Sequence, residues 1–205
     1  MFTPAEAAAF VDLPPKRVHK EIEKKVIGAD KPPRLDFFAL VYLRALKLLD
    51  IELPVQTRAE IYRQLGDALR RSESVDEIEV AKLLTLHVAT VTKELASKVE
   101  RFQRWREGLV SNPEIMAGET VFPNSRVTVR GVGGRLERGE IPEVLLEDYP
   151  QLTQDDLEFA RLFVRAYPRV GRPPTDRSSA HRRRPLAVGR AKARQRGRHR
   201  RGARS

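Results

Sequence analysis

The amino-acid sequence predicts a mainly α-helical protein with small β elements, in which an N-terminal winged helix-turn-helix is followed by a small C-terminal helical domain. Three observations support this fold class. Apolar residues recur at helical spacing through most of residues 1–168, a Pro-Pro break separates two short helical segments at the start, and one stretch, 78–88, is rich in branched residues. A chain of 205 residues, 40% of them hydrophobic, is long enough to bury the cores that such domains need.

Two short helices are expected at the start of the chain. Thr3–Glu6 carries a capping box and a proline at the first helical position, which predict a helix that ends near Asp12. Pro14-Pro15 breaks the chain and can start a second helix, in which Val18 and Ile22 face one core. The polar residues of this second helix are expected to lie largely outside: Lys16, Arg17, His19, Lys20 and Glu21.

A small β-hairpin, or wing, is expected after the second helix. Val26–Gly28 and Arg34-Leu35 are its predicted strands, and residues 29–33 form the turn between them. Asp36 then caps the helix FFALVYLRALKLL. Because this helix is apolar nearly all round, we expect it at the buried centre of the first domain.

The middle of the chain predicts a helix, a strand and a second helix. Thr57–Glu60 has the residues of another capping box, residues 78–88 predict a strand, and residues 90–107 predict a helix. After a loop, further helices are expected from about Val127, from Pro142 and after Thr153, which would cap the last one.

The formal net charge of +11 is concentrated at one end of the chain. Residues 169–205 hold 14 Lys and Arg against one acid, whereas residues 1–168 hold 25 bases and 27 acids. Because no hydrophobic periodicity survives in this end, it is expected to be disordered. The sequence therefore predicts a winged helix-turn-helix at 1–54, a connecting helix–strand–helix region at 55–108, the C-terminal domain at 109–168 and a disordered basic tail at 169–205.

Composition narrows the class of protein. The chain has no cysteine, which excludes a disulfide scaffold and a Cys-ligated zinc site and fits a reducing cytosol. Its first residues lack the basic start and long apolar core of a signal peptide. No apolar run approaches the roughly 18 residues that a membrane span needs. We therefore expect a cytoplasmic protein that does not associate with a membrane.

The sequence does not predict an enzyme. Its four histidines are scattered, without the spacing of metal ligands on a helix. Gly131–Gly134 lacks the spacing of a phosphate loop and indicates a flexible or closely packed helix start. Asp155-Asp156 fits the positive end of a helix better than a metal site. We expect no catalytic residue, metal or cofactor, and the remaining enzymatic alternative is a metal-dependent nuclease that uses Asp155 or Asp156.

The first domain carries the candidate DNA-binding residues. Two short helices with a tight break, a hairpin and a buried helix follow the order of a winged helix-turn-helix, whose second helix enters the major groove. Lys and Arg can pair there with guanine edges or phosphates, and a wing can reach the backbone. The alternative is that these are ordinary solvated charges. The predicted DNA-binding residues are Lys16, Arg17, His19 and Lys20 of the second helix and Lys31 and Arg34 of the wing.

The first 50 or so residues resemble the N-terminal helix-turn-helix of MerR-like regulators. That family usually has a capped first helix with an E-A pair, an apolar turn residue and a basic second helix. Glu6-Ala7 and Leu13 match this form, whereas the aromatic–Trp pattern common in the family's recognition helix is missing. The resemblance implies a DNA-binding head.

Residues 109–168 resemble the bacterial domain-of-unknown-function family 433. Its usual run is N-P-x-I, G-x-P/T-V, R-I/V-x-V, a glycine and E-D-Y-P-x-L-T. The matching segments are Asn112–Ile115, Gly118–Val121, Arg126–Val129, Gly139 and Glu147–Thr153. The resemblance implies a helical, helix-turn-helix-like fold, in which Arg126 is the candidate exposed functional residue or a partner in a structural salt bridge.

The two resemblances together imply a VapB-type antitoxin of a type II toxin–antitoxin system, because members of the second family are commonly interpreted as antitoxins of PIN-like toxins, which are metal-dependent ribonucleases. The head, as a homodimer, would bind operator DNA at two half-sites. Arg169 and Arg172, the first bases after the last predicted helix, would pair with the toxin's carboxylates. The alternative is a stand-alone transcriptional regulator whose basic tail clamps DNA.

Overall fold

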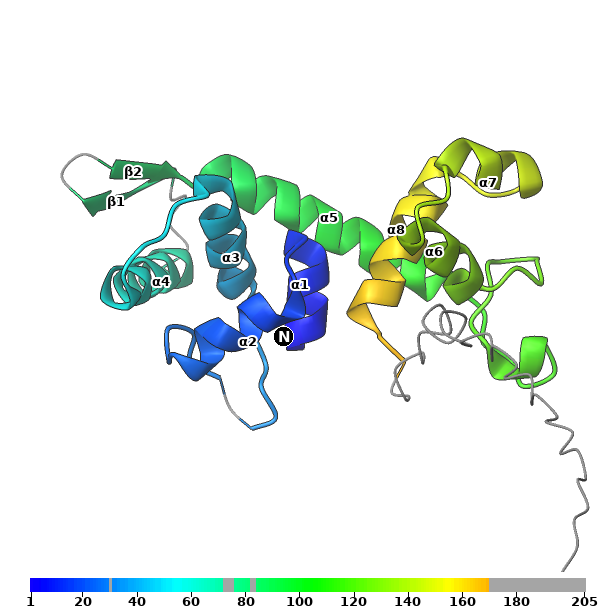
Figure 1. The fold of residues 1–205 in the computed structure, drawn as a ribbon, viewed down its shortest axis with the longest axis horizontal. Helices are drawn as coiled ribbons and strands as arrows, with labels where there is room; N and C mark the ends of the chain where they lie inside the picture. Colours follow the sequence, from blue (N-terminus) through cyan, green and yellow to red (C-terminus); the bar gives the residue numbers. More distant parts are fainter. Residues whose placement is uncertain (30, 72–75, 82–83, 170–205) are drawn as a thin grey trace, which may run out of the picture. The chain divides into compact units, whose positions relative to one another are not determined.

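The computed structural model describes residues 1–29, 31–71, 76–81 and 84–169. The tail beyond Arg169, including Arg172, lies outside the described residues. The prediction that it is disordered concerns residues that the structure does not describe. The predicted mainly helical fold with small β elements is confirmed, and its β part in the described residues is one two-stranded sheet (Figure 1). The elements are α1 (Pro4–Val11), α2 (Pro15–Glu23), α3 (Phe37–Leu49), α4 (Val55–Arg70), β1 (Glu77–Ala81), β2 (Leu84–His87), α5 (Ala89–Glu107), the 3-10 helix η1 (Met116–Gly118), α6 (Val129–Glu137), α7 (Pro142–Asp148) and α8 (Gln154–Ala166).

Helices α1 and α2 follow each other across a tight turn, in the order that the sequence predicted. The amide of Thr3 donates to Glu6 Oε2 at 2.8 Å and the amide of Glu6 donates to Thr3 Oγ1 at 3.2 Å, which completes the capping box. Asp12 ends α1 in the left-handed region with φ 55°, a conformation that Asp tolerates better than most residues. Residues 12–14 then turn the chain directly into α2.

The predicted wing at residues 26–35 is wrong. No strand pair forms among the described residues of this segment, and Leu35 instead makes an isolated antiparallel bridge with Phe2. The amides of Val26 and Ile27 both donate to Glu21 O, so this part of the chain closes the end of α2. Both side chains are buried, whereas successive residues of a strand would point to opposite faces.

A hairpin does form, but at residues 77–87. The sequence predicted one strand there, and the structure has two, β1 and β2, which pair antiparallel with Ile78 opposite Leu86. Both of these side chains are buried against the rest of the unit. A lone strand would leave its backbone groups without partners, and folding back on itself supplies them.

Two predicted caps do not form. Helix α4 begins at Val55, so Thr57–Glu60 lies inside the helix, and Glu60 pairs with Arg63 instead of capping. Asp36 stands at the N-cap of α3 but its side chain makes no capping hydrogen bond. The predicted burial of α3 is confirmed, because seven of its thirteen residues are buried.

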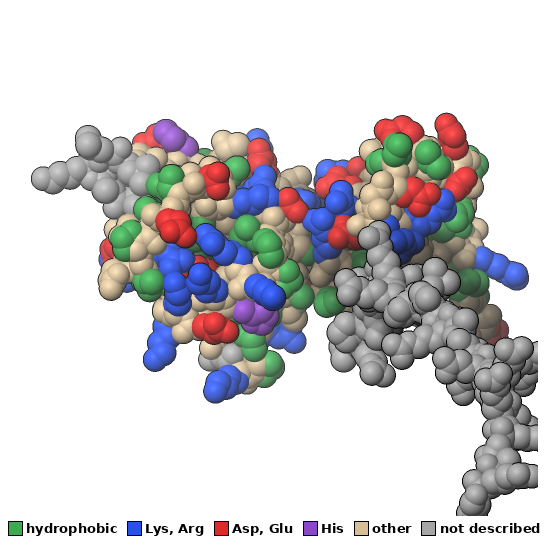
Figure 2. Space-filling model, viewed as in Figure 1, with side chains coloured by type: hydrophobic (Ala, Val, Ile, Leu, Met, Phe, Trp, Pro, Cys, Tyr) green, Lys and Arg blue, Asp and Glu red, His purple; other side chains and the backbone are tan. Residues whose placement is uncertain are grey.

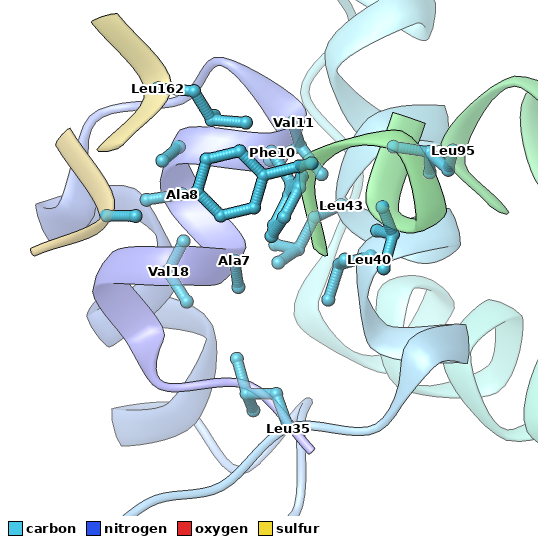
Figure 3. Packing of buried hydrophobic residues seen from close by; sticks show 14 of the residues in the cluster. Ala7, Ala8, Phe10, Val11, Val18, Leu35, Leu40, Leu43, Leu95 and Leu162 are labelled. Atoms are coloured by element: carbon cyan, nitrogen blue, oxygen red, sulfur yellow. The ribbon is translucent and has the colours of Figure 1, made fainter. Parts of the chain in front are cut away.

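Residues Met1–Arg169 belong to one unit, and all three expected segments within it contribute to one hydrophobic cluster. Helix α5 contacts α1, α3 and α8. The expected boundaries at 54 and 108 stay predictions. Figure 3 shows this convergence in Phe10 and Val11 of α1, Leu40 and Leu43 of α3, Leu95 of α5 and Leu162 of α8.

The segment Glu147–Thr153 forms the corner between α7 and α8. Helix α7 ends before Pro150, and Thr153 starts α8 with a capping box that it shares with Asp156. Leu152 is buried at this corner and Tyr149 packs against the core. This motif therefore positions α8, which contacts α1, α5, α6 and α7 and belongs to the third region of the chain, residues 109–168.

The glycines of Gly131–Gly134 lie in α6, as a closely packed helix start. At Gly133 an added Cβ would stand 2.3 Å from Ala160 O and 2.4 Å from Val164 Cγ2, both of α8. Such distances are far below van der Waals contact, so the two helices touch through the bare backbone of this glycine. Helix α6 could not lie this close to α8 with any other residue there.

Gly133→Ala should therefore lower the free energy of unfolding by about 1–3 kcal/mol or more through overpacking. Gly134→Ala is the matched control, because its Cβ would meet only the end of Arg138 at 3.4 Å. In a helix this control change should be neutral or stabilising by up to ~1 kcal/mol. Urea unfolding followed by circular dichroism measures both, and equal stability of the two variants would contradict the packing argument.

The candidate nucleic-acid interface

Helix α2 is held from its inner side by Val18 and Glu21. Both are buried, at 0% and 1% exposure. The prediction that Glu21 lies outside is wrong, because position 21 is one helical turn from Val18 and shares its face. The Glu21 carboxylate accepts a hydrogen bond from the Tyr42 hydroxyl of α3 at 3.0 Å and forms an ion pair with Arg58 of α4. Three helices therefore meet at one carboxylate.

The charge of Glu21 shapes the chemistry of its neighbours. Burial, together with the nearby carboxylate, raises the pKa of Tyr42 well above its ordinary value, so the phenol remains a hydrogen-bond donor. Arg58 is also buried, with 10% of its side chain exposed. Its Nη1 donates a hydrogen bond to the Glu21 carboxylate, whereas its Nε has no hydrogen-bond partner among the described residues.

The outer side of α2 carries the predicted DNA-binding cations. Lys16, Arg17, His19 and Lys20 are all exposed, and Figure 2 shows Lys and Arg side chains gathered over this part of the unit. Among the described residues, none of the four has a carboxylate within ion-pair distance. Glu23 is the one acid exposed among them on this helix.

The other predicted DNA contacts come from a loop. Lys31 and Arg34 are exposed, but they lie between α2 and α3 and not on a hairpin. Sequence reasoning missed Lys24 and Lys25, which are also exposed at the end of α2. Lys24 continues the helical spacing of Arg17 and Lys20, and that spacing could have identified it.

Several arginines in the rest of the unit differ from the α2 cations in having carboxylate partners. Arg101 pairs with Asp155 at 2.6 Å, and Arg161 pairs with Glu137 at 2.7 Å. Arg135 pairs with both Glu140 and Asp148. These arginines are committed to carboxylates within the chain, whereas the cations of α2, like Arg126, have no ion-pair partner among the described residues.

The helix-turn-helix is tied to the third region by polar contacts. Arg165 of α8 donates to the Asp12 carboxylate at 2.7 Å, and Lys47 of α3 donates to it at 2.6 Å. The hydrogen bond from Lys47 lowers the pKa of Asp12, and Arg165 adds to this effect. Tyr167 donates its hydroxyl to Glu6 Oε1 at 2.9 Å. The turn between the two head helices therefore rests on α8.

The motifs of the third region converge on a surface hollow of about 440 Å³. Ile115, Val121 and Arg126, one from each of three motifs, line it. Arg126 is exposed, and it makes no ion pair among the described residues. The alternative of a structural salt bridge is therefore not observed, and Arg126 stays the candidate functional residue here.

The acids considered for a metal site have structural partners. Asp156 accepts from Trp105 Nε1 at 2.7 Å and belongs to the α8 capping box, and Asp155 pairs with Arg101. Within the described ranges, no three His, Asp or Glu side chains gather as metal ligands would. Arg169, a predicted toxin contact, is exposed and forms an ion pair with Glu119. Arg172 lies outside the described residues.

No helix in the described part of the chain combines the length and apolar character needed to cross a membrane.

Comparison with known proteins bears on the third region. Residues 109–164 match the family described as Protein of unknown function (DUF433), which confirms the resemblance seen in the motifs. The chain is also similar to Uncharacterized protein y4eO of Sinorhizobium fredii, with 26% identity over 91 residues. That similarity covers 44% of this chain and 41% of the relative, so the chain spans well under two thirds of that protein's length. No solved structure matched the chain.

Glu21→Gln should destabilise the unit by about 3–5 kcal/mol, because it removes one partner of a buried ion pair and leaves the charge of Arg58 uncompensated. Glu23→Gln, an exposed change two residues away, is the control and should shift stability by no more than about 0.5 kcal/mol. Chemical unfolding at neutral pH measures both. Equal effects of the two variants would show that Glu21 does not anchor α2.

Proposed function

We propose that this chain is the antitoxin of a type II toxin–antitoxin system, which binds operator DNA through α2 and neutralises a PIN-like ribonuclease toxin. The observation that carries the DNA-binding part is the outer face of α2. Exposed cations without carboxylate partners lie there on a helix whose inner face is held by a buried ion pair. A helix presented in this way suits the major groove.

The chemistry of α2 fits both kinds of DNA contact. Arg17 and the two lysines of its outer face can pair with guanine edges or with phosphates. Lys31 and Arg34 are exposed on the following loop and would add backbone contacts, which position a protein on the duplex without specifying sequence. We propose that two copies bind two half-sites, since a homodimer matches the symmetry of a palindromic operator.

The antitoxin part of the proposal is supported by the DUF433 match at residues 109–164 and by what that resemblance implies. In this proposal Arg169 and Arg172 pair with the carboxylates of the toxin's metal site and keep the metal out. Arg169 already pairs with a carboxylate, that of Glu119. Binding a toxin would require it to exchange this exposed partner, at a cost typical of surface pairs.

The second candidate is a stand-alone regulator without a toxin. It is favoured by the charge of residues 169–205, where 14 bases stand against one acid. A tail of this composition would add phosphate contacts and steepen the salt dependence of DNA binding. The two candidates share the head and differ in what the tail binds.

The DNA-binding proposal predicts a loss of affinity when α2 is neutralised. Lys16→Gln with Lys20→Gln should weaken binding to the DNA upstream of the gene by at least about tenfold, and should reduce the salt slope by about one for each phosphate that is no longer neutralised. Lys93→Gln with Arg138→Gln removes the same charge from exposed positions on other helices and is the control. Fluorescence anisotropy across salt concentrations measures both, and equal weakening by the two pairs of substitutions would contradict a role specific to α2.

The toxin proposal predicts that the tail, residues 169–205, is the arm that neutralises the toxin. A variant that ends at residue 168, co-expressed with a PIN-like protein from the neighbouring reading frame, should fail to protect cells. Arg169→Gln with Arg172→Gln should weaken protection, whereas Arg177→Gln should not. Full protection by the shortened variant would exclude the arm as the neutralising element. An unchanged salt slope of its DNA binding would remove the clamp alternative.

A further inference from the structure

A small hollow of about 180 Å³ lies between the outer end of α2 and the start of α4. Arg17, Lys20 and Lys24 line it from one side, and Arg58 and Val55 of α4 line it as well. The volume corresponds to several water molecules, which is more than a single phosphate group requires. This hollow is distinct from the outermost part of α2, because Lys16 and His19 do not line it.

Positive charge predominates in the hollow. Arg17, Lys20 and Lys24 follow each other at spacings of three and four residues, so one side of α2 brings all three to the same place. None of them has a carboxylate partner among the described residues. Glu52 is the carboxylate that lines the hollow. Glu21 does not line it, but forms the ion pair with Arg58. With both acids counted, an excess of two positive charges remains.

Arg58 contributes a buried, incompletely used guanidinium. Its side chain is 90% buried, and its charge is paired with Glu21. Its Nε lies buried without a hydrogen-bond partner among the described residues. Because this Nε is enclosed by protein atoms, Arg58 contributes its positive charge to the lining of the hollow, and not this donor.

The start of α4 adds donors of the same kind. This helix runs for 16 residues, and its N-cap is Pro54, which has no side chain able to cap. The amides of its first turn have no intrahelical partners, and they form the positive end of the helix dipole. Pro54 and Val55 line the hollow, so this helix end borders the space that the three α2 cations surround.

We propose that this hollow binds a phosphate group. Three cations without carboxylate partners, the charge of Arg58 and the uncapped start of α4 all favour an oxyanion such as phosphate. The source is a phosphate of the DNA backbone beside α2 or free phosphate. The assignment to DNA rests on the proposed function, whereas the site itself does not.

The site is tested on the full chain with inorganic phosphate as the probe. Saturable shifts of the Val55–Arg58 amide resonances are expected in NMR spectra, with a dissociation constant on the order of 1 mM. Lys24→Gln should weaken phosphate binding about tenfold, the size of a lost charged hydrogen bond. Lys25→Gln removes the same charge at the adjacent residue, which does not line the hollow. It should leave the dissociation constant for phosphate within about twofold of the wild-type value.

A variant that is expected to strengthen phosphate binding excludes the possibility that the other substitutions act only by unfolding the protein. Glu52→Gln removes the carboxylate that lines the hollow and should tighten phosphate binding. An absence of saturable shifts in the wild-type chain, or equal weakening in Lys24→Gln and Lys25→Gln, would overturn the proposal. Chloride at matched ionic strength is the control for screening.

DNA titrations then identify the source of the phosphate. If the hollow holds a backbone phosphate, Lys24→Gln should lower the salt slope of DNA binding by about one, and Lys25→Gln should lower it less. Phosphate binding together with an unchanged slope in Lys24→Gln would assign the site to free phosphate. Phosphate binding without any DNA binding would support the site and contradict the proposed function.

Discussion

The buried carboxylate of Glu21 determines how α2 is oriented in this protein. Its charge is tolerable in the core only because Tyr42 and Arg58 satisfy it from two other helices. A buried ion pair is weak evidence for added stability, but it strongly disfavours any arrangement that separates its members. Rotating or shifting α2 would break it. The outer face of α2, with its exposed cations, is therefore presented in one orientation.

The same unit joins the head to the region that matches DUF433. The bare backbone of Gly133 lets α6 lie against α8, and α8 in turn packs on α1. Arg165 adds a polar contact from α8 to Asp12, in the turn between the two head helices. A partner that bound the third region would thus act on a helix already in contact with the head.

The pairing of charges is more informative than their number. The excess of positive charge in the sequence lies in the tail, residues 169–205, which holds 14 of the chain's 39 bases. Within the described unit, arginines such as Arg135 and Arg161 are held by carboxylates and stabilise the packing of the third region. The cations of α2 have no such partners among the described residues. The candidate binding surface is distinguished by several cations without ion pairs that lie together on one helix.

The sequence alone determined the local features of this protein: the capping box of Thr3 and Glu6, the basic face of α2 and the motifs of residues 109–164. Each depends on residues a few positions apart. The tertiary structure decided the burial of Glu21, because its partners stand 21 and 37 positions further along the chain. It also decided where the hairpin forms and that α4 borders α2, since such contacts depend on packing and leave no periodicity in the sequence.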